Sequence, residues 1–376
     1  MNEFAYYCPV KVIFSRESYQ ELAKICRYEK VLLLYGRQAV KDSGIYDQIT
    51  EVFDKNRIPF EEYGGITERS YQIYEEAIRI CQREKITCVV GAGGAMVMDA
   101  AKIIAFGAKH ANLNCYLSTR ISGANDEKLG IVLIPTYPSS GSETDGLADA
   151  RTQDGHEGRL RGIYADYALL DPELTCSLNK LNTAYSAMVT FIQASVNYFD
   201  NDNELAKGFT KTVLKTVLDS YQILLKRPDD LDARSNIMWA SAVTTMGILD
   251  CGRNSRYPIS IYTVGDIPCT LYHVSYREGV TLMYPYWLKY MSRYHLEDIK
   301  NFCIDILDID ACLSSQDIIQ KGFEEIKRLM KMGDIPTSSA VYGKAADSCI
   351  NENIKEDLNF SKEELFAMVR ESAEEN

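Results

Sequence analysis

The sequence predicts an α/β fold in its first half and an all-helical fold in its second half. Three observations predict this: short apolar runs alternate with helical patterns, a glycine-rich turn joins one such run to a helix, and strand signals become scarce after about residue 182. At 376 residues the chain exceeds the usual size of a single core. We therefore expect an α/β domain with a parallel sheet over 1–181 and a helical domain over 182–376, with the boundary near Leu178–Thr183.

In the first half, a continuous apolar run over 30–35 is typical of a strand that is buried on both faces of a parallel sheet. Apolar residues at helical spacing favour a helix over 68–85. The remaining expected elements, in order, are a helix over 46–53, a strand over 86–90, a helix from the glycine turn to about 107, and a strand over 131–134.

In the second half, long helical patterns follow one another. We expect helices over 184–200, 206–225, 233–249 and 278–291. Pro268 argues against a regular helix around it.

Composition limits the class of partner and the compartment. A net charge of −12 argues against nucleic acid or an anionic membrane as the main partner. The chain has no signal-like start and no apolar run of membrane-spanning length. Its 11 cysteines form no CxxC pair and are typical of reduced thiols. These features predict a cytoplasmic protein that acts on a small molecule.

The glycine turn is the strongest functional signal. Gly91, Gly93 and Gly94 lie directly between an expected strand and an expected helix. Glycine allows the backbone to approach a ligand closely, and the N-terminus of the following helix attracts anions. The turn therefore predicts phosphate binding, with a simple tight connection as the alternative.

The run from Gly91 to Lys102 resembles the GxGGGSxxDxAK motif of the iron-containing alcohol dehydrogenase family, particularly its butanol-dehydrogenase-like branch. Further similar segments follow in the same order and spacing across nearly the whole chain. These are 32–36 with 44–48, the loop 136–143, the segment 169–172 and the segment 234–240.

The resemblance implies a homodimer of two-domain subunits, with NAD or NADP bound beside a divalent metal that polarises an alcohol or aldehyde. By position, the residues implied to border the cofactor are Gly36, Arg37, Lys41, Gly93, Gly94, Ala95, Met96, Asp99, Thr136 and Ser140. Gly36 stands where NAD-preferring relatives have an aspartate. Arg37 and Lys41 could neutralise a 2′-phosphate, so the sequence favours NADP over NAD, with solvated surface cations as the alternative.

Several residues near the implied cofactor depart from the family pattern or have a simpler interpretation. Ala95 replaces a glycine, and Met96 replaces a serine and cannot donate a hydrogen bond to phosphate. Asp99 and Lys102 could orient the loop, but a surface pair at i, i+3 is the commoner arrangement. Glu143 and Asp145 are expected to cap the segment that follows.

The metal ligands implied by the resemblance are absent from this sequence. The positions of the family's aspartate and histidines fall on Val189, Gln193, Tyr276 and either Ser260 or Tyr262. Valine has no donor atom, and glutamine and neutral tyrosine are weak ligands for a transition metal. The sequence therefore predicts that the usual metal is not bound.

One other group could hold zinc if a fourth ligand joined it: Asp266, Cys269 and His273. A buried cysteine beside a hydrogen-bonded histidine is the favoured interpretation.

Three functions remain open. The first is an NAD(P)-dependent alcohol dehydrogenase or aldehyde reductase, in which Tyr276 or His273 donates a proton in place of the metal. The second is a catalytically degenerate protein that binds a nucleotide or another ligand on the same fold. A different chemistry on this fold is a third alternative.

Overall fold

A computed structural model describes residues 2–36, 39–124, 126–254, 257–343, 345–354 and 357–374. Contacts group the chain into two units. The α/β unit contains Tyr7–Ser177 with Ser241–Gly247; the helical unit contains Met1–Tyr6, Leu178–Ala240 and Ile248–Asn376. The predicted boundary between two separate domains at 181/182 stays a prediction, because these units group residues by contact only. The short segments 1–6 and 241–247 each group with the unit opposite to the one that the sequence pattern suggested.

The α/β unit is built on a six-stranded sheet in which every neighbouring pair is parallel, with the order β1-β8-β5-β4-β2-β3. A separate antiparallel hairpin is formed by β6 and β7. The strands are β1 Lys11–Phe14, β2 Val31–Tyr35, β3 Phe60–Tyr63, β4 Cys88–Gly93, β5 Gly130–Pro135, β6 Leu147–Arg151, β7 Glu157–Arg161 and β8 Tyr167–Leu170.

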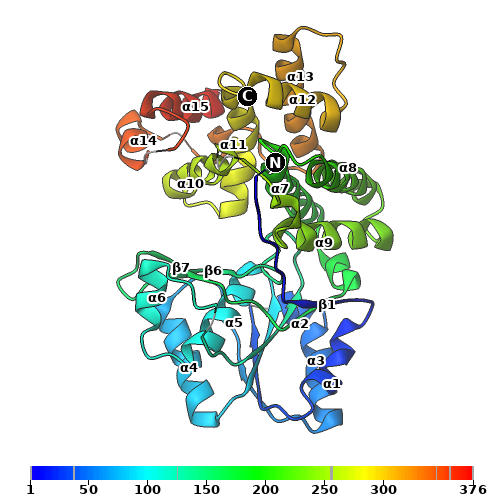
Figure 1. Cartoon of the computed structure of the whole chain (residues 1–376), viewed down its shortest axis with the longest axis vertical. Coiled ribbons are helices and arrows are strands. Elements are labelled where there is room, and N and C mark those ends of the chain that lie inside the picture. Colours follow the sequence, from blue (N-terminus) through cyan, green and yellow to red (C-terminus); the bar gives the residue numbers. More distant parts are fainter. Residues whose placement is uncertain are drawn as a thin grey trace. The chain divides into compact units, whose positions relative to one another are not determined.

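Helices cover both faces of this sheet, with α1 and α3 on one side and α4 and α5 on the other (Figure 1). Alternate residues of β2 therefore enter different cores: Leu32 packs with α4 and α5, whereas Leu33 packs with α1 and α3. This explains the continuous apolar run. The helices of this part are η1 Ser18–Glu21, α1 Leu22–Ile25, α2 Ala39–Asp42, α3 Ile45–Asn56, α4 Tyr71–Glu84, α5 Ala95–Gly107, α6 Leu113–Thr119 and η2 Pro172–Ser177.

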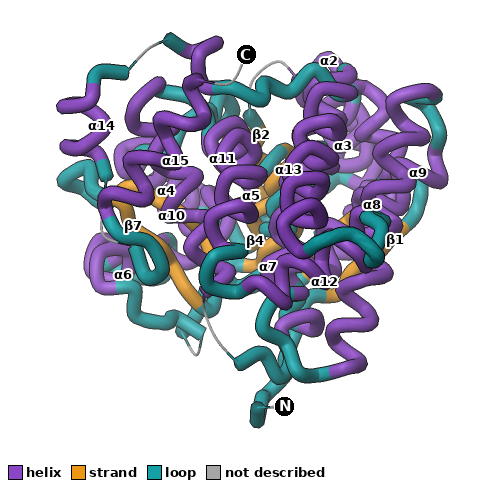
Figure 2. Tube along the Cα trace, turned by 90° about the horizontal axis from the view of Figure 1, so that it is seen from above, coloured by secondary structure: helices purple, strands orange, loops and turns teal. Residues whose placement is uncertain are grey.

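The helical unit packs around one apolar core of its own, to which α7, α8, α10, α11, α12, α13 and α15 contribute. The strands labelled in Figure 2, coloured orange, all belong to the α/β unit. The helices from α7 on are α7 Lys180–Tyr198, α8 Glu204–Lys226, α9 Leu231–Thr245, η3 Ile248–Asp250, η4 Tyr257–Ile259, α10 Ser260–Tyr272, α11 Tyr276–Met291, α12 Leu296–Leu307, α13 Ser315–Met332, η5 Ser339–Tyr342, α14 Asp347–Asn353 and α15 Lys362–Glu374.

The α/β fold with a mainly helical second part is as the sequence predicts. The expectation that Pro268 excludes a helix is wrong, because α10 continues through it. Tertiary packing overrides the lost N–H group: Pro268 is buried, and α10 approaches α11 so closely that a Cβ on Gly265 would lie 2.8 Å from Val280 Cα. Among the described residues, no helix is long and apolar enough to cross a membrane.

Candidate functional site

The glycine turn forms the carboxyl end of β4 and the start of α5. β4 runs on to Gly93, three residues beyond the predicted end of this strand, and α5 begins at Ala95. Gly93 has φ +157°, and a Cβ on it would lie 2.8 Å from Val97 Cγ2. Only glycine fits there without displacing the first turn of α5. The strand, the turn and the free end of the helix thus form one continuous unit.

Three of the residues predicted to border the cofactor lie at one edge of the sheet. β2, β4 and β5 are neighbours, and their carboxyl ends carry Gly36, Gly93 and Thr136. The Thr136 N–H donates to the Gly93 carbonyl over 3.0 Å. Ser140 is half-buried and its Oγ accepts from the Ser142 N–H over 3.3 Å. Ligands of open α/β sheets bind at this edge, outside the carboxyl ends of the strands.

Gly94, Ala95 and Met96 complete the helix start. Gly94 is the N-cap of α5 in an extended conformation, and Met96 is 41% exposed. The first N–H groups of a helix have no partner within it, so this terminus can accept an anion. A contact of these three residues with a cofactor stays a prediction.

The residues predicted to select NADP are only partly described. Gly36 follows β2, and its carbonyl accepts from the Gly65 N–H over 3.0 Å. Lys41 is exposed, with its Nζ 4.7 Å from the ring centre of Tyr46 and 5.3 Å from that of Tyr35. Arg37 lies outside the described residues. Lys41 is therefore an accessible cation near the end of β2.

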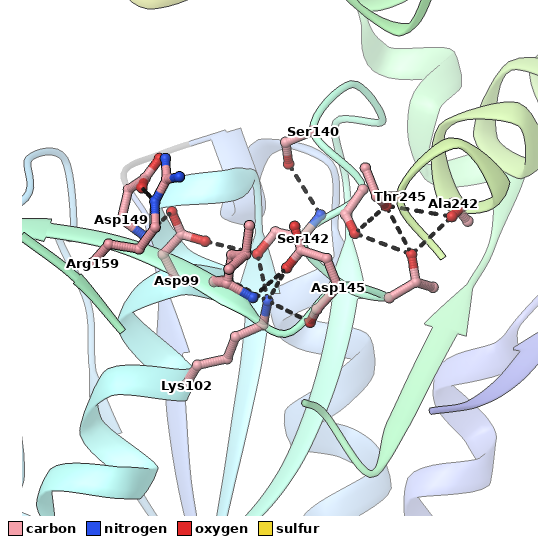
Figure 3. A network of polar contacts seen from close by, with 12 residues as sticks. Asp99, Lys102, Ser140, Ser142, Asp145, Asp149, Arg159, Ala242 and Thr245 are labelled. Carbon is pink, nitrogen blue, oxygen red and sulfur yellow. Dashed lines mark hydrogen bonds and ion pairs between the residues drawn. The ribbon is translucent and has the colours of Figure 1, made fainter. Parts of the chain in front are cut away.

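Asp99 and Lys102 are not a surface pair, and that interpretation of the sequence is wrong. Lys102 is fully buried and Asp99 is 5% exposed. The Lys102 ammonium donates to Ser142 Oγ (3.1 Å), to the Asp145 carbonyl (3.1 Å) and Oδ1 (2.7 Å), and to the Leu147 carbonyl (2.8 Å) (Figure 3). Residues three apart lie on the same face of a helix, so Asp99 and Lys102 both reach Ser142 in the loop that precedes β6. Both side chains are buried because nearly all residues of α5 are buried.

Asp99 joins this loop to the hairpin. Its Oδ1 accepts from Ser142 Oγ over 2.7 Å, and its Oδ2 accepts from the Asp149 N–H over 3.3 Å and from Arg69 Nη2 over 3.4 Å. Arg159 Nε donates to Asp149 Oδ1 over 2.5 Å. Burial raises the pKa of the Asp99 carboxyl to about 6, against the lowering effect of Lys102 and Arg69. A direct contact of Asp99 with the cofactor stays a prediction.

Glu143 differs from its neighbours in the same loop. It is 1% exposed, and within the described part of the chain neither carboxyl oxygen has a hydrogen-bond partner. Burial raises the pKa of this carboxyl to about 7. The predicted capping role is wrong for Glu143, because its oxygens accept no hydrogen bond from the described residues of the following segment. Asp145 does accept from the Leu147 N–H, over 3.0 Å.

A second set of contacts fixes the loop from the side of Ser241–Gly247. Thr144 Oγ1 donates to the Ala242 carbonyl over 2.9 Å, and Thr245 Oγ1 donates to the Gly141 carbonyl over 2.8 Å. Gly141 has φ +64°, and a Cβ there would collide with Thr245 Oγ1 and lie 2.7 Å from the Ser241 carbonyl. Glycine is therefore required at 141 for both conformation and space.

In the helical unit, the predicted proton donors lie around the α10–α11 connection. His273 is the exposed C-cap of α10, with φ +54°, and Tyr276 begins α11 and is 38% exposed. The rings of Tyr276 and Tyr262 have centres 6.5 Å apart. Val189 is buried in α7, and Gln193 follows one turn later.

The proposed zinc group does not converge in the described residues, among which no set of three or more His, Cys, Asp and Glu side chains could hold a metal. Cys269 Sγ instead donates to the Gly265 carbonyl over 3.3 Å. Burial raises the pKa of the Cys269 thiol to about 12, which disfavours a thiolate ligand.

Residues 9–172 match the sequence model of the family described as iron-containing alcohol dehydrogenase. This match lies within the first half of the chain. It is 25% identical over 337 residues to the NADH-dependent butanol dehydrogenase B of Clostridium acetobutylicum, covering 87% of this chain and 85% of the relative. It is 26% identical over 263 residues to the NADPH-dependent aldehyde reductase YqhD of Escherichia coli, covering 67% of each chain.

The fold is also that of the family. The structure of the NADH-dependent butanol dehydrogenase A of Thermotoga maritima superposes with a TM-score of 0.89 at 22% identity, covering 100% of this chain and 99% of the other.

The residues at the metal positions that the resemblance implies do not suit iron or zinc. Val189 is a carbon side chain that is 3% exposed in the core of the helical unit. The other positions offer the Gln193 amide oxygen and the phenols of Tyr262 and Tyr276, which are poor donors for iron or zinc. The Gln193 oxygen is buried, without a hydrogen-bond partner in the described parts of the chain.

Sequence reasoning missed the residues that hold the loop. Ser142, Asp149 and Arg159 belong to the network, and Arg69 reaches it from the segment before α4. The one available signal was the spacing of Asp99 and Lys102 on a helix whose remaining residues are almost all apolar. Two charges in such a helix are buried and must find partners.

Proposed function

We propose that this chain is a nicotinamide-dependent oxidoreductase that reduces an aldehyde or an activated ketone without a catalytic metal. The observation that carries the proposal is the arrangement of the glycine turn: Gly93 ends β4, Gly94 caps α5, and the Thr136 N–H donates to the Gly93 carbonyl. A free helix N-terminus beside such a turn supports the binding of a dinucleotide phosphate. The named activities of the butanol dehydrogenase and aldehyde reductase relatives support the same reaction class. Reduction is favoured over oxidation of a simple alcohol, because no Lewis acid stabilises an alkoxide.

NADP is the proposed cofactor. Gly36, at the end of β2, presents no carboxylate that would repel a 2′-phosphate, and Lys41 is an exposed cation near the same strand end. An alternative role for Lys41 is supported by its position over the Tyr46 ring, where a cation–π contact gains about 0.5–1 kcal/mol at an exposed site.

In the proposed reaction the bound reduced nicotinamide supplies the hydride. The carbonyl oxygen then needs a proton, and Tyr276 or His273 is the proposed donor because both are exposed and both can act as general acids. Gly93 and the N-terminus of α5 bind and orient the phosphate. No step uses a metal, because the carried-over positions lack its donors.

The decisive experiment is titration of the purified protein with NADPH and NADH, followed by thermal shift and elemental analysis. A nucleotide present at 100 times its Kd is expected to raise the free energy of unfolding by about 2.7 kcal/mol. No response to either nucleotide would overturn the proposal. Stoichiometric iron or zinc in the purified protein would overturn its metal-free part.

The proton donor is tested by Tyr276→Phe and His273→Ala, assayed with NADPH and a panel of aldehydes. Loss of the true donor is expected to lower kcat about 10²–10⁴-fold. Tyr28→Phe, at an 87% exposed tyrosine of the α/β unit, is the matched control. Unchanged kcat in both variants would remove these residues from the mechanism.

A second candidate function is supported by the helical unit: a catalytically degenerate protein that binds a nucleotide. None of the metal positions that the resemblance implies carries the family's aspartate or histidine, and a mere change of metal would not require all of them to differ. Nucleotide binding without turnover of any aldehyde or alcohol in the panel would favour this candidate. We also propose a cytoplasmic homodimer that acts on a small molecule; the subunit number is measured by light scattering.

A further inference from the structure

We propose that Asp99, Lys102 and Ser142 form a positioning clamp that sets the loop 136–142 against the N-terminus of α5, and so fixes the shape of the phosphate site. The inference rests on the proposed function, since it assigns what holds that site in shape. The clamp role requires no contact between these side chains and the cofactor.

The ammonium group of Lys102 is buried and is not accessible to a ligand. Lys102 is fully buried, and its acceptors include the backbone carbonyls of Asp145 and Leu147. Together with Ser142 Oγ and Asp145 Oδ1, these acceptors exceed the three N–H donors of an ammonium. Lys102 is therefore not a phosphate-binding lysine. It is satisfied only when the loop before β6 keeps its present path.

Ser142 connects the buried ion pair to the edge of the sheet at which phosphate binding is proposed. Its hydroxyl lies between the two charges, accepting from Lys102 Nζ and donating to Asp99 Oδ1 over 2.7 Å. Its backbone N–H donates to Ser140 Oγ over 3.3 Å. Ser142 thus connects the buried ion pair to a residue that is predicted to border the cofactor.

The proposed phosphate site and the buried ion pair both involve α5. The N-terminus of α5 offers N–H groups to a phosphate, and Asp99 and Lys102 lie one and two turns further along it. A rigid helix that carries both elements fixes the distance between the glycine turn and Ser140. Hydrogen bonds to charged groups are strong in a buried environment, so the loop is held before any cofactor arrives.

The outer part of the network supports a positioning role rather than a second ligand site. Figure 3 shows Asp149 and Arg159 beside Asp99, and Arg69 also pairs with Asp149. The formal charges of the network balance, with the carboxylates of Asp99, Asp145 and Asp149 against the cations Lys102, Arg69 and Arg159. The network therefore gains no charge compensation from a further ion.

The test compares Ser142→Ala with Ser18→Ala. Both serines are buried in the α/β unit, but among the described residues Ser18 Oγ has no hydrogen-bond partner. At a temperature where all proteins are fully folded, Ser142→Ala is expected to weaken NADPH binding about tenfold, and Ser18→Ala less than about twofold. Equal Kd values for the two variants would overturn the clamp.

Hydrogen–deuterium exchange of the nucleotide-free protein provides a second readout that does not depend on binding. Ser142→Ala is expected to speed exchange over 138–146 while the amides of β4 keep their protection, and Ser18→Ala is expected to change neither. Unchanged exchange over 138–146 would overturn the clamp. If the wild-type protein binds neither nucleotide, the proposed function fails, whereas this exchange result still decides the clamp. Asp99→Asn replaces Ser142→Ala if the latter does not fold.

Discussion

Two regions differ in how their side chains are satisfied: the sheet edge of the α/β unit that is proposed to bind phosphate, and the metal positions that the resemblance implies in the helical unit. Beside this edge, Lys102 and Ser142 are buried and matched with polar partners, whereas Glu143 of the same loop has no hydrogen-bond partner among the described residues. At the metal positions, Val189 packs in an apolar core and the Gln193 oxygen has no hydrogen-bond partner within the described residues. The first region is built around polar contacts, and the second around packing.

This difference shows which side chains the fold itself requires. The buried charges of α5 hold a loop in place, so replacing one would leave its partner unpaired. The side chain at 189 lies in a core, where a carbon side chain stabilises the helices as well as or better than an aspartate without its metal. Valine at 189 is therefore compatible with the packing of the helical unit.

The largest expected effect is at the centre of the clamp. Lys102→Met keeps a similar volume but removes the ammonium, which leaves the Asp99 and Asp145 carboxylates without their buried cation. We expect the free energy of unfolding to fall by about 3–5 kcal/mol in urea titration. The matched control is Lys128→Met, which breaks a partly exposed pair with Asp166 and is expected to cost about 0–1 kcal/mol. Equal losses of unfolding free energy in the two variants would contradict a special role for the buried cation.

The second effect is a pH dependence that arises at Glu143. Because burial raises its pKa to about 7 from an ordinary value of 4.5, the folded state holds this proton more tightly than the unfolded state. Its contribution to stability is fully present below pH 4.5 and is lost as the pH rises through about 7. Glu143→Gln keeps the neutral shape, so its free energy of unfolding is expected to exceed that of the wild type by roughly 2–3 kcal/mol at pH 8.

The Glu143→Gln advantage is measured as the difference between variant and wild-type unfolding free energies from pH 4 to pH 8. Glu157→Gln, at an exposed glutamate of β7, is the control. A difference that stays constant across this range would contradict the assignment.

A smaller effect is expected in the helical core. Tyr284 is fully buried and its hydroxyl donates to Ser195 Oγ over 2.8 Å. Tyr284→Phe keeps the ring and is expected to lower the free energy of unfolding by about 1 kcal/mol. A loss as large as that of Lys102→Met would show that polar contacts matter equally in the two regions.

The smallest expected effect is the response to chelation. If the helical unit holds no structural or catalytic metal, incubation with EDTA leaves Tm and the aldehyde reductase activity unchanged. Added zinc or iron is likewise expected not to raise Tm. A fall in Tm after EDTA, reversed by one metal, would contradict the metal-free proposal.

Local pattern was sufficient to predict β2, β4, β5 and the glycine turn, because a buried parallel strand shows a continuous apolar run, as in 30–35. It did not predict β1, β3, β6, β7 or β8. That Gly93 and Thr136 both border the cofactor was implied by the family resemblance and not by local pattern. Local pattern could not predict the partners of Lys102, because Ser142 and Asp145 are about forty residues away and meet it only through the tertiary fold. The prediction that Pro268 excludes a helix was wrong for a similar reason, because α10 is stabilised by its tertiary packing against α11.

The segment Ser241–Gly247 has a practical consequence for dividing this protein. The chain passes between its two units after Tyr6, after Ser177, after Ala240 and after Gly247. A fragment that ended at Ser177 would lack the Ala242 carbonyl and the Thr245 hydroxyl, leaving Thr144 and Gly141 without those partners. Cutting at the apparent boundary in the sequence would thus damage the loop beside the glycine turn. A nucleotide-binding fragment would have to include 241–247, joined by a linker.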